Sequence, residues 1–160
     1  MSSHVQSFDA RQFLCHHLGD VFSTMLSLQV TPEADARMPH FENRVTGSVG
    51  FGGEAVTGAV YLHMSAALAL KATSAMLGLP PGEAAGEQEV NDVAGEMTNM
   101  LAGGLKSTLC DLGAPCAVST PAIIRGTSFE IEALPDVRRE CMVFACDAER
   151  VVVELHIKFN

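Results

Sequence analysis

The sequence predicts an α+β fold in which helices pack on a largely antiparallel sheet. Three segments have helical periodicity, a hairpin pattern stands between the first and the second, and four strand-like segments follow the third. This order of elements favours helices packed on an antiparallel sheet. The length of 160 residues, with 48% hydrophobic and 18% charged residues, suits one domain that spans residues 1–160.

The three helices are predicted from the spacing of apolar residues and from residues that stop a helix. The first runs from about Ala10 to Leu28. The second follows Ser65, a suitable N-cap, and ends at Leu77 before a glycine and two prolines. The third and longest runs from Glu87 to Leu112 and is stopped by Gly113 and a nearby proline.

The strands are predicted from alternating apolar residues. Val45–Phe51 and Val56–Met64 form a hairpin around a glycine pair, and the segment before it, up to Asn43, is predicted to be a surface linker. Four further strands are predicted: Cys116–Ile124, Thr127–Leu134, Glu140–Cys146 and Arg150–Phe159. In the last strand Glu154, His156 and Lys158 share one face, which predicts that this face or edge of the sheet meets solvent.

Charge and composition exclude several classes of partner. Ten Lys and Arg against 19 Asp and Glu give a formal net charge of −9, and the cations are scattered, so nucleic acid and anionic membrane are not expected partners. The most apolar stretch, Ser65 to Leu79, is too short to span a bilayer. The polar start, MSSHVQSFDARQF, does not have the pattern of a secretory signal, and a cytoplasmic location is expected.

No cofactor or metal is expected to be bound by this chain. Its five cysteines contain no C-x-x-C pair, so reduced, buried thiols are the simplest interpretation. His63 and His156 fall on separate strand-like segments, and one ligand from each does not make a metal site. Thiol chemistry at Cys110 or Cys116 is the weakest enzyme hypothesis, because no base stands at a readable spacing.

The exposed side of the long helix carries a line of polar residues and one glycine. Asp92, Glu96, Asn99, Gly103 and Lys106 are four, three, four and three residues apart, so they fall on one side of the helix. The line holds no nucleophile with a base, so any chemistry must use a metal and an electrophile from another molecule. An amide can orient a water for attack on a phosphoryl group, and a carboxylate can pair with a partner's lysine. Periodicity alone also fits a merely solvated helix face.

Three of these positions, together with a later proline, resemble the motif of a known family. Asp92, Glu96, Asn99 and Pro121 are separated by three, two and twenty-one residues, which is the pattern of the CheC/CheX/FliY group of chemotaxis phosphatases. The segments DVFSTMLSLQV and GSVGFGGEAVTGAVYLHM also resemble their CheX counterparts. The resemblance covers nearly the whole chain and implies a hydrolase that dephosphorylates CheY-type response regulators in two-component signalling.

The resemblance also implies roles for single residues. Glu96 would contact the regulator's active-site lysine, and Asn99 would enter its active site to position the attacking water. The regulator would supply Mg²⁺ and the phosphorylated carboxylate. Asp92 would cap or orient the helix and Pro121 would shape the turn behind it, while Gly103 would permit either close docking or tight packing of the helix.

CheX is the member of the group that the chain resembles most. The first helix aligns with the third as a weak internal pseudo-repeat, in which Asp20 matches Asp92, but Thr24 and Ser27 stand in place of the glutamate and asparagine. The resemblance implies a homodimer joined through the sheets, with Val151 to Phe159 as a candidate edge. The alternative is a non-catalytic CheX-like adaptor that binds a receiver domain through the same helix.

Overall fold

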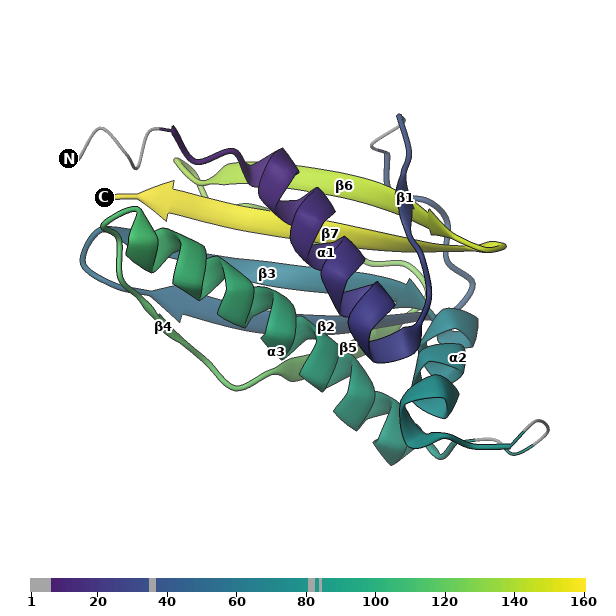
Figure 1. Cartoon of the computed structure of the whole chain (residues 1–160). Helices are drawn as coiled ribbons and strands as arrows, with labels where there is room; N and C mark the ends of the chain where they lie inside the picture. Colours follow the sequence, from purple (N-terminus) through teal and green to yellow (C-terminus); the bar gives the residue numbers. More distant parts are fainter. Residues whose placement is uncertain (1–6, 35–36, 81–82, 84) are drawn as a thin grey trace.

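The computed structural model describes residues 7–34, 37–80, 83 and 85–160. Within these residues the chain forms three helices and a seven-stranded sheet. The helices pack on an antiparallel sheet (Figure 1), which confirms the predicted α+β fold. The strands are β1 (Thr31–Pro32), β2 (Arg44–Gly52), β3 (Val56–Ser65), β4 (Ala117–Val118), β5 (Ala122–Gly126), β6 (Arg138–Cys146) and β7 (Glu149–Phe159). Their order is β1-β6-β7-β3-β2-β4, β5 also pairs with β2, and every pairing is antiparallel.

The three helices begin and end close to the predicted residues. Helix α1 (Ala10–Leu26) begins where the carboxylate of Asp9 accepts a hydrogen bond from the Gln12 amide, at 3.1 Å. It ends two residues earlier than predicted, because Ser27 takes a left-handed conformation with φ 53°. The hydroxyl of Ser65 caps α2 (Ala66–Leu77), and α3 (Glu87–Asp111) is the longest helix.

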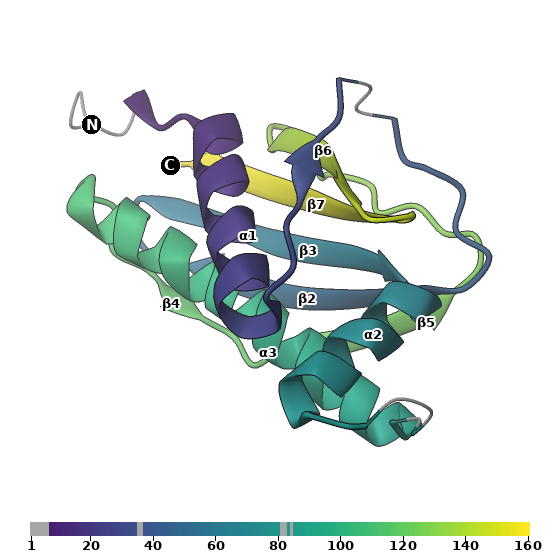
Figure 2. The same cartoon turned by 45° about the vertical axis from the view of Figure 1, so that its right-hand side comes forward.

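All three helices cover the same face of the sheet (Figures 1 and 2). Helices α1 and α3 cross this face next to each other, and α2 lies beyond one end of α1. The core between the two layers is built from large apolar side chains that are fully buried: Leu14, Leu18, Phe22, Leu62, Met64, Leu68, Met97, Leu101, Leu105, Leu109, Phe144 and Leu155. Burial of this apolar layer holds α3 in a fixed position on the sheet.

Two of the predicted strands are wrong in extent or in kind. The predicted strand Cys116–Ile124 is divided into β4 and β5, because Ser119–Pro121 leave the ladder between them. The segment Thr127–Leu134 is not a strand, although its apolar residues alternate. It crosses the sheet face that the helices leave free, and the Phe129 carbonyl accepts a hydrogen bond there from Arg44 of β2.

The predictions for the last strand are also wrong in two respects. β7 lies between β3 and β6, so Val151 to Phe159 is a central strand and not an edge. Most of its second face is covered as well: of the three polar residues predicted to share it, Glu154 is 1% and His156 is 6% exposed, and Lys158 meets solvent. The predicted linker contains β1, which pairs with β6.

None of the helices in the described part of the chain combines the length and the apolar character that a membrane crossing requires. Residues 1–6, the polar start on which the expectation of no secretory signal rests in part, lie outside the described residues.

Candidate functional site

Helix α3 separates buried and exposed residues as the sequence predicts. The side that faces the sheet and α1 is apolar and buried, with residues Val90, Val93, Ala94, Met97, Leu101, Leu105 and Leu109. The predicted polar line is exposed at Asp92, Glu96, Asn99 and Lys106 and half-buried at Gly103. The polar line is therefore a surface of the molecule, on the side of α3 away from the core.

Glu96 and Asn99 stand out on this surface because their side chains are unused. Within the described residues, neither side chain has a hydrogen bond or an ion pair, and both are exposed. They lie one helical turn apart, so a carboxylate and a carboxamide point outward together. Asp92 differs from them, because it accepts a hydrogen bond from the Gln88 amide nitrogen at 2.8 Å. Asp92 lies inside the helix and does not cap it, which corrects one of the two roles expected for it.

A glycine in β2 lets α3 approach the sheet closely beneath this pair. A Cβ atom at Gly47 would overlap the hydroxyl of Thr98 and would lie 3.1 Å from the Ala94 carbonyl. Thr98 is fully buried, and its hydroxyl donates to that same carbonyl at 2.7 Å. Since Thr98 directly precedes Asn99, this contact fixes the height of Asn99 above the sheet.

Pro121 is far from the other motif residues in sequence but lies beside them in the structure. A Cβ at Gly95 would meet the Pro121 ring at 3.4 Å. Pro121 thus lies against the helix one residue before Glu96. It belongs to the Ser119–Pro121 break between β4 and β5, which supports the expected role in shaping the chain behind the helix.

A second contact fixes the first half of α3, and the sequence analysis missed it. Arg125 of β5 donates to the side-chain oxygen of Asn91 from Nε at 3.0 Å and from Nη2 at 2.7 Å, and its Nε lies 3.9 Å from a carboxylate oxygen of Glu87. An arginine that follows the motif proline by four residues was the available signal. Pro121 and Arg125 both contact α3 in the turns that precede Glu96, so they join β5 to this part of the helix.

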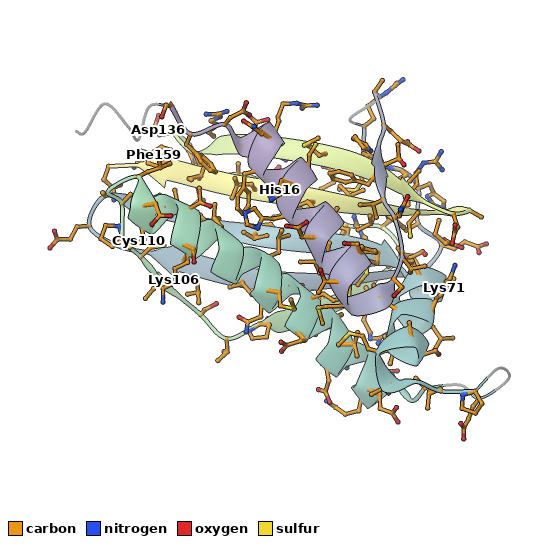
Figure 3. The ribbon with its side chains drawn as sticks, viewed as in Figure 1. His16, Lys71, Lys106, Cys110, Asp136 and Phe159 are labelled. Atoms are coloured by element: carbon orange, nitrogen blue, oxygen red, sulfur yellow. The ribbon has the colours of Figure 1, made fainter. Side chains whose placement is uncertain are left out.

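The line continues beyond the motif to the end of the helix. Lys106 and Cys110 both belong to the C-terminal half of α3 (Figure 3) and are exposed. Gly103 has no atom within 4 Å of the position that a Cβ would take, so the tight-packing explanation for this glycine does not hold. The side of α3 is therefore open at the turn after Asn99.

The described residues contain no group of three or more His, Cys, Asp or Glu side chains that could hold a metal ion. All five cysteines are free, but the expectation of buried thiols is wrong for most of them: Cys146 is buried, Cys110 is exposed and the other three are half-buried. Burial raises the pKa of the Cys116 thiol, which disfavours the reactive thiolate form.

The pseudo-repeat in α1 does not form a second site of this kind. The helix ends at Leu26, so Ser27, which aligns with Asn99, lies past the last helical residue in a left-handed conformation. Asp20 instead lies 3.3 Å from the imidazole of His16, which is labelled in Figure 3. Among the helices of the described residues, α3 alone presents the glutamate and asparagine side chains of the motif.

The arrangement of helices on the sheet is CheC/CheX-like, and comparison with known proteins agrees. A chain of the chemotaxis protein CheX from Vibrio vulnificus is 28% identical, with a TM-score of 0.79 over 93% of this chain and 95% of that one. A CheC-like superfamily protein from Shewanella sp. PV-4 is 26% identical, with a TM-score of 0.77 over 99% of both chains. A chain of the CheX–CheY–BeF3–Mg²⁺ complex from Borrelia burgdorferi is 20% identical, with a TM-score of 0.72 over 94% of this chain and 98% of that one.

The sequence itself assigns the family. The profile of the family described as chemotaxis phosphatase CheX matches residues 45–147, which is more than half of the chain. Among curated protein sequences none matches the chain. The chain belongs to the chemotaxis phosphatase CheX family, as its motif predicted.

Proposed function

We propose that this chain hydrolyses the aspartyl phosphate of a CheY-type response regulator and that α3 is the helix that docks on the regulator. The observation that carries the proposal is the pair of exposed, unpartnered side chains of Glu96 and Asn99 on a helix fixed at both sides. Membership of the CheX family supports the reaction class. The Borrelia complex, which pairs CheX with CheY, BeF3 and Mg²⁺, supports a receiver domain as the partner.

The proposed chemistry is attack by water on phosphorus. The carboxamide of Asn99 enters the regulator's site, holds a water in line with the phosphorus–oxygen bond to the aspartate, and stays uncharged throughout. The water oxygen bonds to phosphorus, the bond to the aspartate oxygen breaks, and inorganic phosphate and a free carboxylate result. Mg²⁺ bound by the regulator would stabilise negative charge on the phosphoryl oxygens.

Glu96 is proposed to dock the regulator and not to take up a proton. Its carboxylate, one turn before Asn99, would pair with the regulator's active-site lysine and so fix the position of the amide. The helix face around this pair is acidic toward the start of α3, because Glu89 and Asp92 precede Glu96 on the same side of the helix. A lysine is therefore the favoured contact for this part of α3.

The assembly state and the location of the chain are proposals as well. We propose a homodimer joined through sheet edges, as expected from the resemblance, but β7 cannot be the edge that joins it. In the described residues the sheet ends at β1 on one side and at β4 and β5 on the other. A cytoplasmic location and a single domain over residues 1–160 also stay predictions.

The proposal is tested by steady-state dephosphorylation of Mg²⁺-bound, phosphorylated CheY-type receivers from the same organism. Asn99→Ala is expected to lower kcat by about 10²-fold or more, as removal of one preorganised hydrogen-bonding group does in other enzymes, and to leave KM nearly unchanged. Glu96→Ala is expected to raise KM. Receivers that bind wild type with no faster loss of phosphate would favour the adaptor, and two variants with wild-type rates would overturn the site.

A further inference from the structure

A cavity lies on the sheet face opposite to the helices. Its volume is about 480 Å³, and it is enclosed by the loop residues 38–41 and 127–131 above the strands. Arg44 of β2, Arg139 of β6 and Glu154 of β7 form its floor. The walls include the apolar side chains of Met38 and Ile131. Nothing in the proposed reaction on α3 uses this cavity.

Arg44 is the unusual residue of this cavity, because it is a buried cation with a free donor. The residue is 4% exposed. Its guanidinium lies over the Phe129 ring, 3.6 Å from the centroid, and 5.7 Å from the centroid of Phe41. One terminal nitrogen donates to the Phe129 carbonyl, but the buried Nε has no hydrogen-bond partner. Within the described residues no carboxylate forms an ion pair with Arg44.

The nearby carboxylate of Glu154 is already fully used by other groups. Its Oε1 accepts from Nε2 of His63 at 3.0 Å, and its Oε2 accepts from Nε of Arg139 at 3.0 Å and from Nε2 of His156 at 3.1 Å. Burial alone would raise the pKa of Glu154, but the hydrogen bonds from His63 and Arg139 lower it to about 2. Glu154 is therefore an ionised group whose ion pair is with Arg139. It acts on the charge of Arg44 only through space, without an ion pair.

A buried cation that has no ion-pair partner is costly, and an anion in the cavity would relieve this cost. The number of charges limits which anion fits. One buried charge calls for a monoanion, and Glu130, an exposed carboxylate on the wall, disfavours a second negative charge. The apolar wall residues suit a ligand with a hydrocarbon part.

We propose that this cavity binds a small organic carboxylate, whose carboxylate group pairs with the guanidinium of Arg44 and whose apolar part lies against Met38, Phe41 and Ile131. The two phenylalanine rings hold the guanidinium in place before the ligand arrives, so little side-chain freedom is lost on binding. The site is on the opposite face from α3 and does not depend on the proposed phosphatase reaction.

The test measures binding of benzoate, with benzyl alcohol as the uncharged control and inorganic phosphate as the second anion. Benzoate is expected to bind by titration calorimetry and to shift the Nε–H resonance of Arg44 in a nitrogen–proton correlation spectrum. Benzyl alcohol is expected to bind at least about tenfold more weakly, because a charge-assisted hydrogen bond is lost. Phosphate is expected to leave the Arg44 resonance unchanged.

Two arginine variants complete the test. Arg44→Met is expected to weaken benzoate binding at least about tenfold, whereas the matched Arg138→Met, at an exposed arginine that pairs with Glu140, is expected to bind benzoate like wild type. If Arg44→Met does not fold, Arg44→Lys replaces it in the test. Arg44→Lys keeps the charge and is expected to retain part of the affinity for benzoate.

Three results would overturn the proposal: no movement of the Arg44 resonance with benzoate, equal binding to wild type and Arg44→Met, or a larger response to phosphate than to benzoate. The proposal would also be overturned if wild type bound no benzoate and Arg44→Met changed the oligomeric state in analytical ultracentrifugation. That result would show that the cavity contacts a second copy of the chain. Because Asn99→Ala leaves this face intact, benzoate binding in that variant separates failure of this proposal from failure of the phosphatase proposal.

Discussion

Two adjacent glycines in α3 give opposite predictions for the same substitution. Gly103 has no atom within 4 Å of the position of a Cβ, while a Cβ at Gly104 would lie 2.7 Å from Nδ1 of His17 on α1. The His17 ring cannot move aside freely, because it lies over the ring of Phe13 with centroids 4.3 Å apart. Alanine is the better helix former at both positions, but it finds open space at only one of them.

Gly103→Ala is expected to stabilise the protein. Replacing a glycine inside a helix by alanine gains about 0.8–1 kcal/mol, and with no steric cost this corresponds to a melting temperature about 2–4 °C higher for a chain of this size. Gly104→Ala gains the same propensity but overpacks the contact between α1 and α3, which typically costs about 1–3 kcal/mol. The free energy of unfolding of Gly104→Ala should therefore lie at least about 1 kcal/mol below that of Gly103→Ala.

The assay is urea unfolding of wild type and the two variants, followed by circular dichroism, with the dephosphorylation rate measured in parallel. Gly103→Ala is expected to be more stable and yet slower, because the new methyl stands on the docking line one turn after Asn99. Equal stabilities for the two variants would refute the assignment of α3's free and packed sides. A Gly103→Ala enzyme with an unchanged rate at limiting receiver would show that the receiver does not approach this turn of the helix.

Further predictions concern the position of α3 and the polar cluster on the other sheet face. Gly47→Ala should destabilise by about 1–3 kcal/mol in urea unfolding and lower the dephosphorylation rate, since its methyl would push Thr98 and α3 away from the sheet; wild-type stability would contradict this contact. Arg125→Ala should change the free energy of unfolding by no more than about 1 kcal/mol, because its contacts are exposed. The same variant should dephosphorylate the receiver more slowly, because α3 is held less firmly, and a rate assay on the folded variant measures this. Acid should destabilise the fold in two windows, as measured by unfolding at several pH values. Burial lowers the pKa of His63 below 6.5 in the folded protein, so the unfolded chain takes up this proton first and the fold loses stability as the pH falls below about 6.5. The pKa of Glu154 is about 2 in the folded protein, against 4.5 in the unfolded chain. Protonation of Glu154 therefore lowers the free energy of unfolding by a further amount of the order of 3 kcal/mol as the pH falls below about 4.5. Glu154→Gln should flatten the lower window, and an unaltered acid profile in that variant would contradict the role of this carboxylate.

The parts of the fold that could be predicted from the sequence depend on local pattern. The three helices follow from apolar spacing and from caps such as Ser65, which act within a few residues. The hairpin of β2 and β3 is confirmed, with Val49 opposite Val60 in the ladder. These signals are carried by neighbours along the chain, so they do not need the tertiary structure.

The errors arise where contacts between distant residues decide the outcome. The alternation in Thr127–Leu134 predicts a strand, but Phe129 packs on Arg44, 85 residues away, and the segment covers the sheet as a loop. The polar face of β7 indicates solvent, yet Glu154 finds its partner His63 at a separation of 91 residues. A buried polar group and an exposed one look the same in a sequence when the partner is so far away.

The candidate site divides in the same way. The exposed line of Asp92, Glu96 and Asn99 follows from helical geometry, and the structure confirms its exposure. The residues that hold the helix do not follow from it: Gly47 lies beneath Thr98, and Arg125 reaches Asn91 across 34 positions. The roles of Glu96 and Asn99 in the reaction stay predictions.

The most direct test of the central claim compares two identical substitutions on α3. Asn99→Ala and Asn91→Ala each replace a carboxamide by a methyl in the same helix, with the same gain in helix propensity. Single-turnover loss of phosphate from a Mg²⁺-bound, phosphorylated CheY-type receiver is measured with wild type and both variants. We expect acceleration by wild type, a smaller but clear acceleration with Asn91→Ala, which loses its contact with Arg125, and a rate at least about 10²-fold lower than that of wild type with Asn99→Ala. Equal acceleration by both variants, or none by wild type with any receiver, would contradict it.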